Sequence, residues 1–256
     1  MTDPTPLDRA HLHAEETGAD TDRLAFFERL AEAELHLLLE TEEGDVITPR
    51  LVDLEGTRYA LAFDLQERLT DFAGPAHAAT LSGRRLAAML ASEGLGLALN
   101  LEDAPSAQLL EPEAMDWLAG LLARAPEEED RRIEEITSPG VLPERLLAAL
   151  DGKLALAVGL ARTGYLAGVT YDGGARGHIL GFVDAVPGSE RDLARAVSEA
   201  LVFSGLDAGQ IDVTFLRAQQ PLAATLARHG LRIDLPQPEA MPMRAPPPRD
   251  TPPRLR

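Results

Sequence analysis

Short apolar runs joined by tight, glycine-containing turns occur in two sets along the chain, and this pattern restricts the fold more than any other feature. In the first half, strand-like runs cover residues 35–41, 46–54 and 57–63, and the breaks between them are EEGD and EGT. Turns of this length join antiparallel neighbours, since parallel pairing needs a long crossover. The first half therefore predicts a three-stranded antiparallel meander.

Helical patterns surround this meander. Residues 22–34 repeat apolar side chains at helical spacing, whereas the first twenty residues lack such a period and predict a loose arm. Asp64 followed by Glu67 resembles a capping box, and Ser82 is a suitable N-cap for a helix that Gly94 ends. The helices expected in the rest of this half cover 65–73, 83–92 and 112–125.

The second half repeats this plan loosely. Strand-like runs at 153–161, 164–172 and 176–185 are separated by RTG and DGGA, which are hairpin signals. Further helices are expected at 143–152, 190–205 and 220–230, and further strands at 211–216 and 231–236. We expect an α+β protein of two small domains, each an antiparallel meander sheet packed by helices.

The expected domain organisation follows from charge and proline content. An N-terminal domain covers 7–124, and an acidic linker covers 125–142, where Ile133 and Ile136 provide apolar anchors for one edge strand. The C-terminal domain covers 143–235. The tail, 236–256, holds eight of the nineteen prolines and four arginines, which is typical of a disordered segment.

Charge and composition exclude several classes of function. The net charge is −18, and residues 1–125 alone carry 24 acidic residues against nine arginines. Such a surface repels phosphate backbones, so we expect no nucleic-acid partner. The absence of cysteine excludes disulfides and thiolate chemistry and fits a reducing cytoplasm. We expect a cytoplasmic protein with no membrane contact, because no apolar stretch reaches the length of a span and the start does not resemble a secretory signal.

The stretch GLGLALNLEDAPS, residues 94–106, resembles a phosphate-binding loop at first sight. A dinucleotide loop lies between a strand and a following helix, but here a helix precedes the glycines and a strand follows them. We therefore interpret NLEDAPS as a loop between two strands, either a plain turn or a binding edge. Its candidate binding residues are Asn100, Asp103, Pro105 and Ser106.

A second glycine cluster, DGGARG, joins two predicted strands at 172–177. Its glycines suit the positive φ of a hairpin, and the alternative is an anion-binding nest with Arg176. His178 follows in the next strand, where a hydrogen-bonded histidine is commoner than a ligand. Arg176 and His178 complete the candidate binding surface.

No recognisable catalytic or metal-binding motif is present. The six histidines form no H-E-x-x-H pair, and neither G-x-S-x-G nor a P-loop occurs. Lys153 is the only lysine. Its expected position at a helix C-terminus suits a cation, because a positive charge there complements the helix dipole. The alternative is a lysine that forms a Schiff base. We name no catalytic residue, cofactor or metal ligand, and we favour a protein that is not an enzyme.

The arrangement resembles the SseB family, named for enhanced serine sensitivity. The likeness lies in FFERLAEAELHLLLE, YALAFDLQERLTDFA and GLGLALNLEDAPSAQLLEPEAMDWL for its N-terminal domain, and in SPGVLPERLLAAL and GLDAGQIDVTFL for its C-terminal domain. It spans residues 7–235 and implies the same two-domain organisation. The family implies no catalytic residues.

Our first hypothesis is a non-catalytic binding or adaptor protein with an unknown protein partner. The alternative is a small-molecule sensor or enzyme with a site between the domains, where such sites are common. Its first residues to test would be Asn100, Asp103, Ser106, Arg176 and His178. A third alternative is a secretion-associated factor. The sequence does not indicate an oligomeric state.

Overall fold

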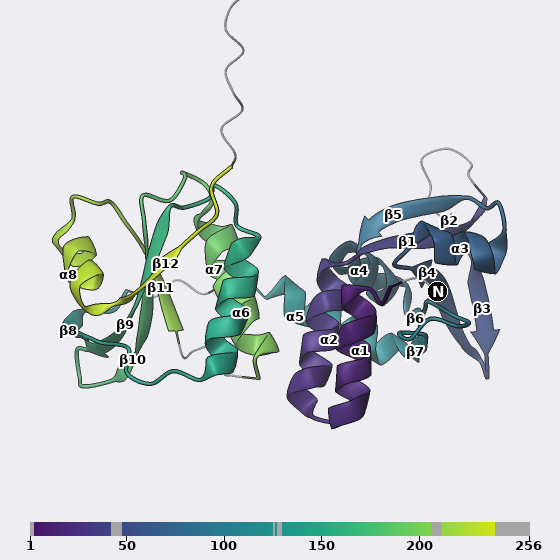
Figure 1. Ribbon diagram of the computed structural model, residues 1–256, viewed down its shortest axis with the longest axis horizontal. Helices are drawn as coiled ribbons and strands as arrows, with labels where there is room; N and C mark the ends of the chain where they lie inside the picture. Colours follow the sequence, from purple (N-terminus) through teal and green to yellow (C-terminus); the bar gives the residue numbers. More distant parts are fainter. Residues whose placement is uncertain (1–2, 42–47, 125, 127–129, 206–210, 239–256) are drawn as a thin grey trace, which may run out of the picture.

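The computed structural model describes residues 3–41, 48–124, 126, 130–205 and 211–238. Two sheets with helices packed against them make the α+β architecture that the sequence predicts (Figure 1). The expected turn at 42–45, the acidic run at 127–129 and the tail from 239 onward lie outside these ranges.

The first sheet is built from the N-terminal half of the chain. Its strands are β1 (Glu34–Thr41), β2 (Thr48–Pro49), β3 (Leu51–Leu54), β4 (Thr57–Phe63), β5 (Ala78–Ser82), β6 (Gly96–Leu99) and β7 (Gln108–Leu110). They follow the order β2-β1-β4-β6-β7, with β3 beside β4 and β5 beside β1. The helices are α1 (Pro6–Thr17), α2 (Asp20–Glu32), α3 (Gln66–Ala73), α4 (Gly83–Glu93) and α5 (Pro112–Ala123).

The prediction of a purely antiparallel meander is wrong in two respects. The middle run divides into β2 and β3, and β1 pairs directly with β4 through His36–Phe63 and Leu37–Ala62. Strand β4 also pairs with β6 in parallel. The segment between them contains α3, β5 and α4, which is long enough for a parallel crossover. The sheet is therefore mixed.

Local signals in this half are confirmed where they concern turns and caps. Glu55 and Gly56, at the β3–β4 turn, both have positive φ, which matches a two-residue hairpin turn to the right-handed twist of its strands. Ser82 accepts the backbone N–H of Arg85 and so caps α4, and Gly94 ends that helix in the left-handed region.

The second sheet has the order β11-β10-β9-β12, with β8 also paired to β9. Its strands are β8 (Ile133–Thr137), β9 (Thr163–Tyr171), β10 (Arg176–Val183), β11 (Ile211–Leu216) and β12 (Leu231–Asp234), and its helices are α6 (Glu144–Ala155), α7 (Glu190–Phe203) and α8 (Pro221–His229). The expected hairpin at Gly173–Gly174 and the expected edge strand at 133–137 are both present. Strands β10 and β11 are parallel, with α7 as the crossover, so this sheet is also mixed.

The predicted strand at 153–161 is wrong. Helix α6 continues to Ala155, and turns follow it. Leu146, Leu150 and Leu154 recur every four residues and are buried together, so the helical period overrides the apolar run at the end of the helix. Consequently the expected RTG turn is not a hairpin turn, because β9 already begins at Thr163.

The predicted loose arm is also wrong, since residues 6–17 form α1. Thr5 and Asp8 make a reciprocal capping box, with Pro6 at the first helical position. Leu7 and Ala14 are buried in the core of the first domain. The capping box expected from Asp64 and Glu67 does not form: the N-cap of α3 is Leu65, which makes no side-chain cap.

Both faces of each sheet are covered. In the first domain, α1, α2, α4 and α5 contribute to one core, and α3 covers the opposite face. In the second domain, α6 and α7 cover one face and α8 the other. Phe203, at the end of α7, packs in the core of the first domain and thus joins the two halves. No helix among the described residues is long and apolar enough to cross a bilayer.

Candidate functional site

The loop between β6 and β7 buries a polar residue near each of its ends, Asn100 and Ser106. Asn100 is fully buried, with a positive φ of 46°. Its Oδ1 accepts the backbone N–H of Asp64 at 2.9 Å, and its Nδ2 donates to Ser106 Oγ at 2.8 Å. Asparagine tolerates the left-handed region better than most residues, and here its amide also ties the two sides of the loop together.

A carboxylate from α1 completes this network. The Ser106 hydroxyl donates to Asp8 Oδ1 at 2.5 Å, and Arg68 Nη2 donates to Asp8 Oδ2 at 2.5 Å. Arg68 also donates to Asp64, whose other oxygen accepts the Thr5 hydroxyl. Burial alone would raise the pKa of the Asp8 carboxyl, but the hydrogen bonds from Arg68, Ser106 and Thr5 outweigh it and lower that pKa to about 2.

The hydrogen bonds of this network stabilise the fold. Asn100 and Ser106 contact each other, but both are fully buried and their polar atoms are used within the protein, so neither offers the binding edge that is the alternative interpretation of this loop. Asp103 and Pro105 are exposed on the same loop. The arrangement fastens α1 to the loop. Asp8 was missed by sequence reasoning, although the Thr5-Pro6-Leu7-Asp8 capping pattern was available as a signal for the helix that carries it.

The other two candidate residues lie in the second domain. Arg176 begins β10 and is exposed. His178, on the same strand, has Nε2 3.1 Å from the carbonyl oxygen of Pro139. Asn100 and Ser106 belong to the first sheet's loop, so the structure does not bring the five residues of the sensor hypothesis into one site.

The contact between the domains contains a buried ion cluster that sequence reasoning missed. Lys153, on α6, is 5% exposed, and its Nζ lies 2.7 Å from Glu32, 3.2 Å from Glu28 and 3.4 Å from Glu199. Glu28 and Glu32 come from α2, whereas Glu199 comes from α7. Arg84 of α4 donates to both carboxylate oxygens of Glu199, at 2.9 and 2.8 Å. Helices α2, α4, α6 and α7 therefore each contribute a charged side chain that pairs with an opposite charge on a neighbouring helix.

Burial and pairing act in opposite directions on these groups. Desolvation would lower the pKa of the Lys153 ammonium, but the Glu32, Glu28 and Glu199 carboxylates raise it above its usual range. Desolvation raises the pKa of Glu28, and Lys153 offsets only part of that rise. The lysine thus stays charged, and burial of the charged Glu28 carboxylate has a cost that its pairing with Lys153 offsets only in part.

A shallow hollow of about 240 Å³ lies beside this cluster, lined by residues of α2, α6 and the end of α7. Arg145 donates to the Thr21 hydroxyl at 2.6 Å across it. Lys153 Nζ lies 5.2 Å from the centre of the Phe203 ring, a cation–π contact. The charged groups bind one another across the contact, and this arrangement holds the two domains together.

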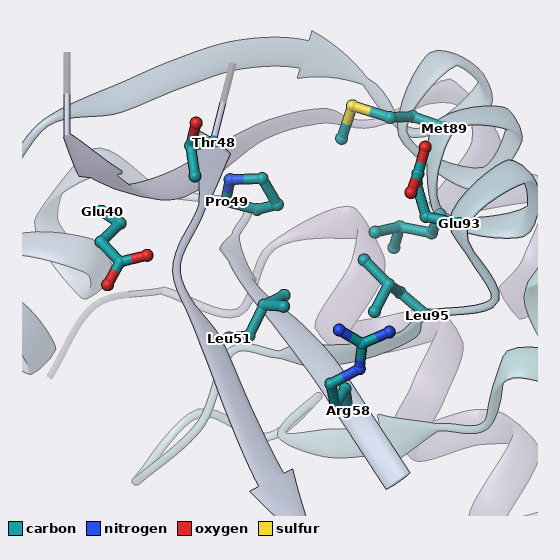
Figure 2. Close-up of a pocket in the computed structure, with 9 residues that line it drawn as sticks. Glu40, Thr48, Pro49, Leu51, Arg58, Met89, Glu93 and Leu95 are labelled. Atoms are coloured by element: carbon teal, nitrogen blue, oxygen red, sulfur yellow. The ribbon is translucent and has the colours of Figure 1, made fainter. Parts of the chain in front are cut away.

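A larger groove, about 380 Å³, lies on the first domain between α4 and the β2–β3 segment (Figure 2). Leu51 pairs with Ala60, which packs in the core beneath α4, so Leu51 also faces α4. Pro49 and Leu51 line one side of the groove, and Met89 and Leu95 line the other. Leu51 is 37% exposed, so the groove presents apolar surface to solvent.

Charged side chains surround this apolar surface. Glu40, Glu93 and Arg58 line the groove and are exposed. Arg58 lies near Leu95, and Glu93 lies near Met89 (Figure 2). Within the described ranges, none of the three makes an ion pair or side-chain hydrogen bond with another residue. The groove therefore combines an apolar surface with charges that have no partner among the described residues, whereas Asp8 and Lys153 each bind several groups.

No group of three or more histidine, aspartate or glutamate residues in the described part of the chain is placed to hold a metal ion. Comparison of the chain with protein-family models, with curated proteins and with solved structures finds no match. The groove, the interdomain cluster and the Asn100 network are therefore interpreted from their own geometry.

Proposed function

We propose that the protein is a non-catalytic protein-binding module whose docking surface is the groove between α4 and the β2–β3 segment. The observation that carries the proposal is the exposure of Leu51 in an apolar groove, with charged residues at the rim. Protein interfaces combine an apolar centre with a polar surround in this way. The buried polar atoms of Asn100, Ser106 and Lys153, by contrast, bind other groups of the fold.

The proposed occupant is a segment of a partner protein that inserts an apolar side chain between Leu51 and Met89. A cytoplasmic location and a relationship to the SseB family are part of the same proposal. The resemblance supports it because the family implies no catalytic residues, and the acidic first half supports a protein partner over a nucleic acid.

A small-molecule sensor is the second candidate function. The observation that favours it is the hollow of about 240 Å³ at the contact between the domains. Sites of this kind occur preferentially between domains. Retention of a metabolite by the purified full chain, and its loss in a variant of Arg145, would favour this candidate over the first.

The proposed docking surface can be tested by site-specific photo-cross-linking in cells. A photoreactive residue at position 51 should yield a discrete cross-linked protein, and the same residue at position 109 should not. Leu109 is the matched control because it is 42% exposed but lies on β7, outside the groove. Equal cross-linking at both positions, or turnover of a metabolite by the pure protein, would contradict the proposal.

A further inference from the structure

We infer that the groove selects a partner segment in which an apolar residue is adjacent to a lysine or arginine. The inference rests on the proposed function and adds the chemistry of the partner. It follows from the charges at the rim and from their lack of partners within the described residues. Three observations support it, concerning the floor, the rim and the surrounding field.

The floor sets the requirement for an apolar side chain. Leu51, Met89 and Leu95 line the groove together with Pro49. Leu95 is buried at 5% exposure, whereas Leu51 retains 37% exposure, so the groove is open above its floor. Apolar surface that remains exposed in the free protein becomes a source of binding free energy when a partner covers it.

The rim sets the requirement for a basic side chain. The Glu93 carboxylate lies on the α4 side, beside Met89, and Glu40 lies on the strand side (Figure 2). Neither makes an ion pair in the described parts of the chain. Among the described residues that line the groove, Arg58 is the one cation, and together with Glu40 and Glu93 it gives these side chains one net negative charge. A partner cation beside the apolar anchor would satisfy Glu93, and an anion there would be repelled.

The electrostatic field of the acidic first half also favours a partner segment with positive charge. Residues 1–125 carry 24 acidic residues against nine arginines. A surface of this kind accelerates the approach of a cationic segment and slows that of an anionic one. Local contacts and the long-range field therefore select the same partner chemistry.

The test uses a phage-displayed library of random twelve-residue peptides, selected on the full-length chain. Selected peptides should pair Leu, Ile, Met or Phe with an adjacent Lys or Arg. Their affinity should fall about fivefold in Glu93→Arg, because an exposed attraction is replaced by repulsion, and less in Glu93→Gln. Leu51→Asp should weaken binding more than tenfold, and Leu109→Asp should not change it. Circular dichroism of each variant verifies that it is folded.

The outcomes separate this inference from the proposed function. If Leu51→Asp abolishes binding but Glu93→Arg leaves it unchanged, the groove is the docking surface and the preference for a basic residue is wrong. Enrichment of acidic peptides would overturn the inference in the same way. If Leu51→Asp and Leu109→Asp bind alike, or if no peptide is enriched, the docking surface itself is wrong.

Discussion

Replacing Lys153 by methionine should reveal how strongly the ion cluster joins the two domains. Methionine has a similar length but no charge, so Lys153→Met removes the ammonium and leaves the Glu28, Glu32 and Glu199 carboxylates in place. Their oxygens lie 3.2, 2.7 and 3.4 Å from Nζ in the native protein. Only Glu28 loses its sole ion-pair partner within the described residues, since Arg29 pairs with Glu32 and Arg84 pairs with Glu199.

The expected loss in the free energy of unfolding is about 3 kcal/mol. Removing one partner of a buried pair costs roughly 3–5 kcal/mol. The lower end applies because the Glu28 and Glu32 side chains keep 13% and 18% of their surface exposed, which lets water solvate part of the freed charge. For a chain of this size, about 3 kcal/mol corresponds to a fall in Tm of roughly 6–12 °C, measured by scanning calorimetry.

The pH dependence distinguishes lost charge pairing from lost packing. The penalty in Lys153→Met comes from unpaired carboxylates, so it should be complete above the pKa of Glu28 and should shrink as the pH falls through it. Burial already raises that pKa, and loss of Lys153 raises it further. Lys153→Arg, which keeps the charge, should lose less than half as much stability. A penalty below about 1 kcal/mol, or one that is equal at about pH 8 and about pH 5, would refute the reasoning.

Three further substitutions test other parts of the fold, each by thermal or denaturant unfolding. Asp8→Asn should cost about 2 kcal/mol near neutral pH. Because the folded-state pKa of Asp8 is lowered to about 2, this difference should persist above the usual value of 3.8 and disappear as the pH falls toward 2. Ser82→Ala should cost about 1 kcal/mol through loss of the α4 cap, whereas Ser82→Asp should retain stability. Gly83→Ala should be severely destabilising, because its Cβ would lie 1.7 Å from the carbonyl oxygen of Leu30, and an unchanged Tm would contradict this packing.

Sequence reasoning succeeded where the determinant was local. The Glu55–Gly56 turn, the Ser82 cap and the strand–loop–strand arrangement of 96–110 depend on residues close together in the chain, and each is present. It failed where distant packing decides between two local possibilities. The run after Lys153 has strand-like composition, but Leu150 and Leu154 are buried on one side of a helix.

The roles of the candidate site residues also depend on contacts between distant parts of the chain. Asn100 and Ser106 were identified from their loop, but their role depends on Asp8, which is 98 residues from Ser106 in the chain. Nothing in the spacing of these residues indicates that contact. The groove was not predicted either, because Leu51 and Met89 come from different elements and each alone is an ordinary apolar residue of a strand or helix.

The burial of Lys153 also has a chemical consequence. It is the only lysine in the sequence, and the fold keeps it 5% exposed with its ammonium among three carboxylates. Acylating reagents, and enzymes that join groups to a lysine side chain, require an accessible and uncharged amine. The raised pKa of Lys153 makes the uncharged form scarcer still. While the two domains remain in contact, Lys153 should not react with lysine-directed reagents. Reaction at its Nζ would therefore report separation of the two domains.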